Sequence, residues 1–199
     1  MVVQNQAQIR TFTWQNRPGN SGLQIMSTVA RTERLTLRQF TLEDAADLFE
    51  LNSDPEVIRY TGDLPVESVE AAEQFLDNYS AYAQTGFGRW AVIRNSDKRF
   101  VGWCGLKLNE ESLNDLGFRF FRDCWGKGYA TESARASLDL GFGQFHLDEI
   151  IGRTAKQNHA SMHVLEKLGM QKWKTGECEG FPDALYYRID ERTYRHHND

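Results

Sequence analysis

The segment from Phe118 to Thr131 constrains the fold more than any other part of the chain. It reads as an apolar strand that runs into a glycine turn, Gly126-Lys127-Gly128, and then into a helix. The first turn of a helix has free N–H groups and a partial positive charge. Glycines at 126 and 128 carry no Cβ that would hold a phosphate away. The segment therefore predicts an anion site made of backbone, where a strand passes into a helix.

The patterning of apolar residues around this segment predicts an α/β fold in one domain. Strands are expected at 35–37, 89–94, 100–108, 115–121, 149–154, 170–174 and 184–189, and helices after Thr41, after Asp54, from Ser68 to Gly86, from 129 to 145 and from Asn158 to Gly169. Polar turns between the strands from 89 to 121 favour an antiparallel meander. The order predicts a mixed, mostly antiparallel sheet with helices on both faces.

Composition and charge bound the partners. Residues 1–27 are rich in Gln, Asn and Ser and contain a Pro18–Gly22 breaker cluster, so we expect a flexible N-terminal extension before a domain at 28–199. The net charge is −5 without a basic run, which argues against a nucleic-acid partner. No apolar run approaches the ~20 residues that cross a membrane, and the first 25 residues lack the apolar core of a signal peptide. Three widely spaced cysteines complete the expectation of a soluble, cytoplasmic protein.

Several other functional classes lack their motifs. The P-loop pattern is absent, and Thr131 stands where a dinucleotide fold would have its third glycine. His159 and His163 have the spacing of two zinc ligands, but position 160 is Ala instead of Glu and no third ligand follows, so we expect no metal. A serine hydrolase is not supported, because no G-x-S-x-G occurs.

Three stretches together resemble the GNAT acetyltransferase superfamily, and its ribosomal-protein N-acetyltransferase branch most. They are Thr32–Arg38, Trp125–Glu132 and Asn158–Met170, and the similarity extends over about residues 28–190. The resemblance implies a sheet that splays between the strand ending near Phe121 and the strand at 149–154. It also implies an enzyme that transfers acetyl from acetyl-CoA to a primary amine, either a protein N-terminus or a small amine. A monomer or a homodimer, with no nucleic acid and no membrane, is expected.

The resemblance also implies which residues bind acetyl-CoA. The expected set is Phe120, Trp125, Gly126, Lys127, Gly128, Tyr129, Ala130, Thr131 and Asn158. The pyrophosphate would lie on the backbone N–H groups of 126–130, and Asn158 would bond the pantetheine. Trp125 departs from the Gln or Arg that is usual in the family, but backbone contacts do not depend on that side chain.

The catalytic residues are less well defined. Many family members have a tyrosine acid at a position that is Leu165 here, whereas the ribosomal branch uses a serine that is present as Ser161. Ser161 could assist the departing thiolate or only complete a helix cap. Glu177 and Glu179 are candidate bases, with Asp115 as a third, although each could be a surface carboxylate. Backbone N–H groups of the strand at 116–121 would stabilise the oxyanion.

A second function remains open at this stage. A domain of the same fold could hold acetyl-CoA as a sensor without turning it over. The missing tyrosine and the undefined base permit this alternative.

Overall fold

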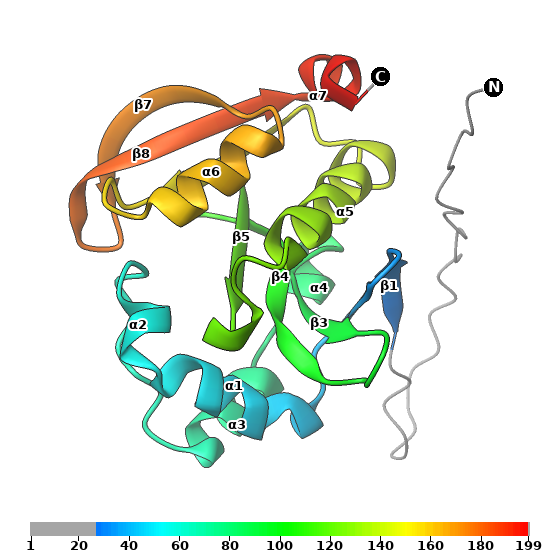
Figure 1. Ribbon diagram of the computed structural model, residues 1–199, viewed down its shortest axis with the longest axis vertical. Coiled ribbons are helices and arrows are strands. Elements are labelled where there is room, and N and C mark those ends of the chain that lie inside the picture. Colours follow the sequence, from blue (N-terminus) through cyan, green and yellow to red (C-terminus); the bar gives the residue numbers. More distant parts are fainter. Residues whose placement is uncertain (1–26, 199) are drawn as a thin grey trace.

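The computed structural model describes residues 27–198, and the expectation for an N-terminal extension concerns residues almost entirely outside that range. Eight strands form one sheet in the order β1-β2-β3-β4-β5-β6-β8-β7 (Figure 1). They are β1 (Thr28–Arg31), β2 (Leu35–Arg38), β3 (Arg89–Arg94), β4 (Phe100–Leu108), β5 (Asn114–Phe120), β6 (Glu149–Thr154), β7 (Gln171–Cys178) and β8 (Phe181–Asp190). All neighbours pair antiparallel except β5 and β6. The predicted mixed, mostly antiparallel sheet is confirmed.

Helices cover this sheet. They are η1 (Leu42–Asp44), α1 (Ala45–Ser53), α2 (Pro55–Ile58), α3 (Val69–Asp77), α4 (Ala81–Thr85), η2 (Arg122–Cys124), α5 (Tyr129–Gly143), α6 (His159–Lys167) and α7 (Glu191–Asn198). Helix α5 packs on β2, β4 and β5, whereas α6 packs on β6. Consecutive residues of β4 are buried from Phe100 to Gly102 and from Cys104 to Leu106, which shows that both faces of the sheet are covered. Within residues 27–198, no helix has the length and apolar character needed to span a membrane.

Side chains cap the helices where the sequence predicts that they begin. The Ser68 hydroxyl accepts a hydrogen bond from the Ala71 N–H (3.2 Å) at the start of α3. At η1, the Asp44 carboxylate accepts from the Thr41 N–H (2.8 Å). Each bond satisfies a backbone group that a helix terminus leaves without an intrahelical partner.

The single helix predicted from Ser68 to Gly86 is wrong, because the chain forms α3 and α4 with a break between them. The Asn78 amide donates to the Gln74 carbonyl (2.7 Å) at the end of α3. The Tyr79 hydroxyl then accepts from the Arg89 N–H (2.6 Å), and the Tyr82 hydroxyl donates to the Arg89 carbonyl. These tertiary bonds to the start of β3 outweigh the helical periodicity, which describes only local sequence.

Strand β1 and helix α7 were not predicted, and β7 and β8 are longer than expected. The sequence of α7 is highly polar, so it lacks an apolar stripe that would reveal a helix. Among residues 191–197 only Tyr194 is buried, and its ring lies 5.3 Å from that of Phe142 on α5. A single buried aromatic residue gives too little periodicity to detect in the sequence.

The one parallel contact of the sheet is very short. Strands β5 and β6 share only the residue pairs Asp115↔Ile151 and Leu116↔Gly152. Beyond them, β6 follows β8 over the six pairs from Glu149↔Asp190 to Thr154↔Leu185. The sheet therefore opens between β5 and β6, which is the place where the family resemblance implies a splay.

Candidate active site

A cavity of about 540 Å³ lies at the opening between β5 and β6. Its walls come from β5 and β6, from helices α1, α3 and α6, and from the segments 60–66 and 178–179. The Phe121 N–H donates to the Val101 carbonyl on β4 (3.1 Å). Because N–H groups alternate sides along a strand, those of Phe118 and Phe120 face away from β4 and toward the opening. Backbone donors therefore line one wall of the gap.

The glycine turn lies between η2 and the start of α5, and none of its residues lines this cavity. Gly126 and Gly128 have φ values of +71° and +80°, a left-handed conformation that favours glycine. A Cβ on Gly126 would meet no atom within 4 Å. The first hydrogen bond of α5 joins the Glu132 N–H to the Gly128 carbonyl (3.0 Å), so the N–H groups of residues 129–131 precede the helical ladder. The turn has the open space and the free donors that bind an anion.

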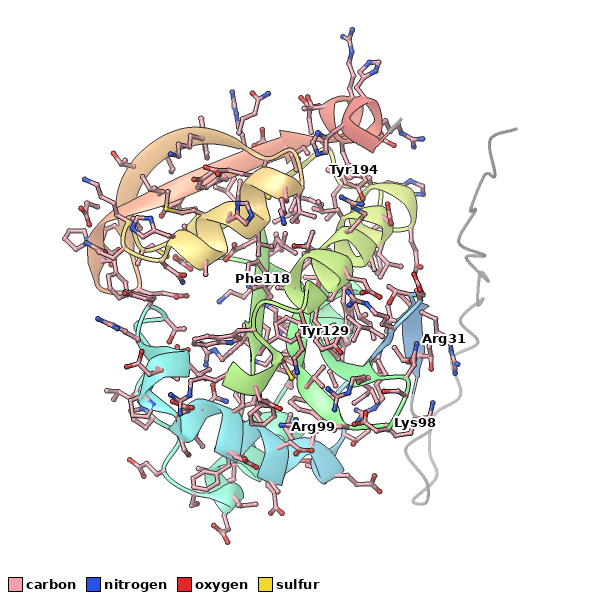
Figure 2. The ribbon with its side chains drawn as sticks, viewed as in Figure 1. Arg31, Lys98, Arg99, Phe118, Tyr129 and Tyr194 are labelled. Atoms are coloured by element: carbon pink, nitrogen blue, oxygen red, sulfur yellow. The ribbon has the colours of Figure 1, made fainter. Side chains whose placement is uncertain are left out.

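Trp125 fixes the turn to the end of β5. Its indole Nε1 donates to the Phe120 carbonyl (2.8 Å), while half of the residue remains exposed. The Phe120 side chain is buried in the core, so of this residue only the backbone faces the opening. Figure 2 labels Phe118 on β5 and Tyr129, which is the first residue of α5 and has a buried ring.

A second contact, which the sequence analysis did not identify, holds the turn from the other side. Arg34 forms an ion pair with Glu132 (2.6 Å) and donates to the Lys127 carbonyl (2.9 Å). The Glu132 carboxylate also accepts from the Thr32 hydroxyl (2.6 Å). Burial raises the pKa of Glu132, but these hydrogen bonds outweigh burial and the net shift is downward. The charged Glu132 therefore ties the start of α5 to the segment before β2.

Asn158 begins α6 at the other side of the opening. Its Oδ1 accepts from the Ser161 N–H (3.1 Å), which confirms the predicted cap. The cap uses the backbone of Ser161, and within residues 27–198 no group forms a hydrogen bond with the Ser161 hydroxyl. Both side chains line the cavity, together with Leu165. The side chain that caps α6 is therefore that of Asn158, and the Ser161 side chain does not take part in the cap.

The two candidate glutamates lie in different environments. The Glu177 side chain accepts from the Gly180 N–H (3.0 Å), lies on the surface and does not line the cavity. Glu179 is also exposed, with 44% of its side chain accessible, but it lines the cavity. Its carboxylate lies 3.9 Å from both Lys107 Nζ and Arg153 Nη2 and accepts no hydrogen bond from the described residues. Burial raises the pKa of Glu179, and the two cations oppose this in part.

The turn that carries Glu179 is unusual. Cys178 pairs with Phe181, so Glu179 and Gly180 form a two-residue hairpin loop with φ values of +51° and +84°. Such a turn prefers Asn, Asp or Gly at its first position, because other residues are strained there. A Cβ on Gly62 would lie 1.9 Å from the Glu179 carbonyl oxygen, so the segment 60–66 packs directly on this turn. The turn thus fixes Glu179 at the rim of the cavity.

Asp115 has a structural environment. It is buried, and its carboxylate accepts from both Arg153 Nη2 (2.9 Å) and Arg153 Nε (3.2 Å). Arg89 adds a third cationic contact at 3.7 Å. The Asp115 carboxylate therefore links β5 to Arg153 of β6 and to Arg89 of β3. Among the three candidate bases, Glu179 has the most suitable surroundings.

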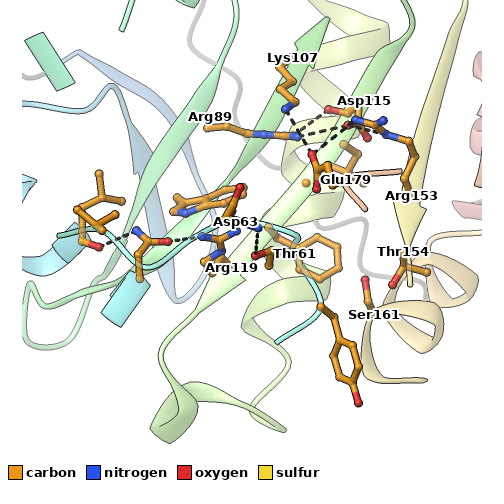
Figure 3. A pocket seen from close by; sticks show the side chains of 18 of the residues that line it. Thr61, Asp63, Arg89, Lys107, Asp115, Arg119, Arg153, Thr154, Ser161 and Glu179 are labelled. Carbon is orange, nitrogen blue, oxygen red and sulfur yellow. Dashed lines mark hydrogen bonds and ion pairs between the residues drawn. The ribbon is translucent and has the colours of Figure 1, made fainter. Parts of the chain in front are cut away.

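Figure 3 shows how these side chains share the cavity. Lys107, Arg89, Asp115, Arg153 and Glu179 gather at one end, and Ser161 and Thr154 lie at the other. Arg119 lies between them and donates to Asn52 and Asp63. The sequence did not predict a role for these arginines and Lys107, because they lie on four different strands and come together only when β3, β4, β5 and β6 pair in the sheet.

The histidine pair of α6 lies outside this cluster. His159 and His163 are both exposed. Across residues 27–198, no group of three or more His, Cys, Asp or Glu side chains is placed to hold a metal ion. Metal-independent activity stays a prediction.

Comparisons with known proteins agree with this geometry. Residues 34–171 match the model of the acetyltransferase (GNAT) domain. The uncharacterised N-acetyltransferase p20 of Bacillus licheniformis is 34% identical over 146 residues, which cover 71% of this chain and 81% of that protein. The solved GNAT-family acetyltransferase of Bacillus anthracis has a TM-score of 0.70 at 29% identity and covers 81% of this chain and 98% of its own.

A further solved structure is similar in fold alone. Spermidine N-acetyltransferase of Vibrio cholerae, in complex with CoA and spermine, has a TM-score of 0.70 at 22% identity, covering 82% of this chain and 99% of that one. The domain match spans most of the chain, including the glycine turn and the Asn158 helix. The protein therefore belongs to the GNAT acetyltransferase family and is an acyltransferase.

Proposed function

We propose that this protein transfers acetyl from acetyl-CoA to a primary amine by direct attack in a ternary complex. The observation that carries the proposal is the cavity at the sheet opening, which brings Glu179 and Ser161 to one space beside the backbone of β5. A base, a hydrogen-bond donor for a leaving group and donors for an oxyanion are the groups that acyl transfer needs.

The residues present fit acetyl-CoA. The N–H groups at the start of α5 favour a pyrophosphate, and the absence of Cβ atoms at 126 and 128 gives it room. The opening between β5 and β6 has unpaired strand edges that can bond an amide-containing arm such as pantetheine. Asn158 uses Oδ1 for its cap, while its Nδ2 has no partner among the described residues and can donate to a pantetheine carbonyl.

The proposed chemistry conserves atoms and charge. The neutral amine attacks the thioester carbonyl, the N–H groups of Phe118 and Phe120 stabilise the oxyanion, and a C–N bond replaces the C–S bond. Glu179 takes the proton that the amine loses. Ser161 donates a hydrogen bond to the departing sulfur and relays a proton to it from water, and the proton held by Glu179 then returns to the resulting hydroxide, so that the products are the amide and the free thiol. Because Glu179 has a raised pKa, it suits proton transfer near neutral pH better than an ordinary carboxylate.

The resemblance of Trp125–Glu132 and Asn158–Met170 to the ribosomal-protein branch supports a protein N-terminus as one acceptor. An α-amino group has a pKa near 8, against about 10.4 for a lysine side chain, so more of it is neutral at pH 7. A single carboxylate is therefore sufficient to remove the proton from an α-amino group, which is already partly neutral at this pH.

A screen for thiol release tests the proposal directly. The purified protein is incubated with acetyl-CoA and pools of peptides, amino acids, polyamines and small monoamines, and free CoA is detected. We expect release above background with at least one pool. Thermal stabilisation by acetyl-CoA without release in any pool would instead support the sensor alternative.

The second prediction concerns the anion site at the glycine turn. Gly128→Val should weaken acetyl-CoA binding by at least about tenfold, because a branched side chain at this turn blocks close approach of a phosphate. The left-handed φ also strains any such substitution by about 1–2 kcal/mol. Gly86→Val is a control matched in φ (+82°), although its Cβ would have a neighbour only at 4.0 Å, whereas a Cβ on Gly128 would lie 3.3 Å from Arg34 Nη2. Both variants should lose stability, but calorimetry should show a lower acetyl-CoA affinity only for Gly128→Val. Equal acetyl-CoA affinities of the two variants would contradict an anion site at this turn.

The third prediction concerns Ser161. Because the cap uses its N–H and not its hydroxyl, Ser161→Ala should leave the melting temperature nearly unchanged. The variant should lower kcat by up to about a hundredfold, the lower end of the range for acid catalysis, with little change in acetyl-CoA affinity. A wild-type kcat would mean that water alone protonates the thiolate.

The fourth prediction separates catalysis from strain at Glu179. Glu179→Asn should lower kcat/KM while it keeps or raises the melting temperature, by up to about 4 °C, because Asn tolerates the left-handed turn. In the wild type, kcat/KM should fall as pH falls through the raised pKa of Glu179, since the protonated carboxyl cannot accept a proton. This acid limb should be missing from the residual activity of Glu179→Gln. An unchanged limb would assign the base elsewhere.

A further inference from the structure

The end of the cavity that carries Glu179 is rich in cationic side chains, and we call it the acceptor end. Among the lining residues, Arg89, Lys107, Arg119 and Arg153 are cationic, whereas Asp63, Asp115 and Glu179 are anionic. With Glu179 ionised, the lining has one more positive than negative charge, and Glu110, which pairs with Arg153 from outside the lining, balances it. A polyamine would bring several further positive charges into this space, and like charges at close range repel.

The three arginines of the cavity already have partners. Arg153 is almost fully buried and binds Asp115 (2.9 Å) and Glu110 (2.6 Å). Arg89 donates to the carbonyls of Gly105 and Asp115. Arg119 donates to Asn52 and Asp63. Arg119 Nε is buried and has no hydrogen-bond partner among the described residues, whereas the guanidinium groups of Arg89 and Arg153 have little capacity left for an additional anion.

Lys107 differs from them. Its side chain is 40% exposed, lines the cavity and forms no hydrogen bond with any described residue. Its single ionic contact in residues 27–198 is Glu179 at 3.9 Å, which is longer than a hydrogen bond. Figure 3 shows the two side chains pointing toward each other. An ammonium and a carboxylate thus face the same space, each with hydrogen-bonding capacity unused.

We propose that the acceptor is an amine that carries a carboxylate one or two carbons away, as a free amino acid does. Lys107 binds the acceptor carboxylate, and Glu179 receives the proton of the acceptor amine. The pair is complementary to a zwitterion, because each charged group of the acceptor meets its opposite and the net charge of the cavity is unchanged. This assignment rests on the proposed acetyl transfer and specifies its substrate class.

The assignment also distinguishes this chain from a polyamine enzyme. The spermidine N-acetyltransferase of Vibrio cholerae shares the fold at 22% identity, which carries no information on the acceptor of this chain. A polyamine has no carboxylate for Lys107, and its ammonium would compete with Lys107 for Glu179. A peptide N-terminus presents a carbonyl oxygen at the same place, which Lys107 can bond only as a neutral acceptor, and neutral acceptors bind more weakly than charged ones.

The test compares matched acceptors. Thiol release from acetyl-CoA is measured with a set of amino acids, with the amines formed by removing their carboxylates, with a short peptide and with spermidine. We expect kcat/KM for the best amino acid to exceed that for its matched amine and for spermidine by at least about tenfold, the range of a charged hydrogen bond. Equal or faster turnover of spermidine or of the matched amines would overturn the inference, as would thiol release with none of the amino acids.

Variants of Lys107 supply the second arm. Lys107→Met should raise KM for the amino acid about ten- to a hundredfold and abolish the preference over the matched amine, whereas Lys107→Arg should retain much of it. Each preference is compared with that of the wild type, so differences in amine pKa cancel. Lys172→Met is the control, because Lys172 lies on β7 outside the cavity and its removal changes the net charge equally. A preference that survives in Lys107→Met would exclude Lys107 as the carboxylate ligand.

Calorimetry with acetyl-CoA alone distinguishes a failure of the proposed function from a failure of the acceptor assignment. If the wild type does not bind acetyl-CoA, the proposed function fails and the inference fails with it. If acetyl-CoA binds and some amine is acetylated without preference for a carboxylate, the proposed function stands and only the acceptor assignment is wrong.

Discussion

The ion pair between Asp115 and Arg153 is the interaction on which the site depends most. It joins β5 to β6 where the two strands share only two residue pairs, and both side chains are more than nine-tenths buried. Without a cross-strand connection, so short a parallel contact would define the geometry of the opening poorly. Removing one member of a buried pair commonly costs about 3–5 kcal/mol, because the other charge is left without compensation. Both members of the pair line the cavity, and Arg153 also lies 3.9 Å from Glu179.

Much of the architecture could be predicted because it depends on local patterns. The bounds of β3, β4 and β6 follow from alternating or continuous apolar residues between turns, and the structure has them at the predicted positions. The Asn158 cap is equally local, since the donor lies three residues along the chain. The break between α3 and α4 could not be predicted in this way, because hydroxyl bonds to Arg89 on another element create it.

The choice between Glu177 and Glu179 shows where the sequence becomes insufficient. Two residues apart on a regular strand, they would share one face. The pairing of β7 shifts between Gly176 and Cys178, and the chain then turns through two left-handed residues. Glu177 consequently bonds the turn itself, while Glu179 reaches the cavity. The segment that packs on the turn includes Gly62, more than a hundred positions away, and no local pattern records that contact.

The left-handed conformation of Glu179 has a consequence for the history of this fold. Asparagine and glycine favour the turn but cannot accept a proton, and aspartate can accept one but is shorter than glutamate by a methylene, so under the proposed reaction folding and turnover make different demands on this position. In a gene copy released from selection for catalysis, drift would favour asparagine or glycine there. The side chain found at this hairpin in related chains would therefore indicate which of them remain under selection as enzymes.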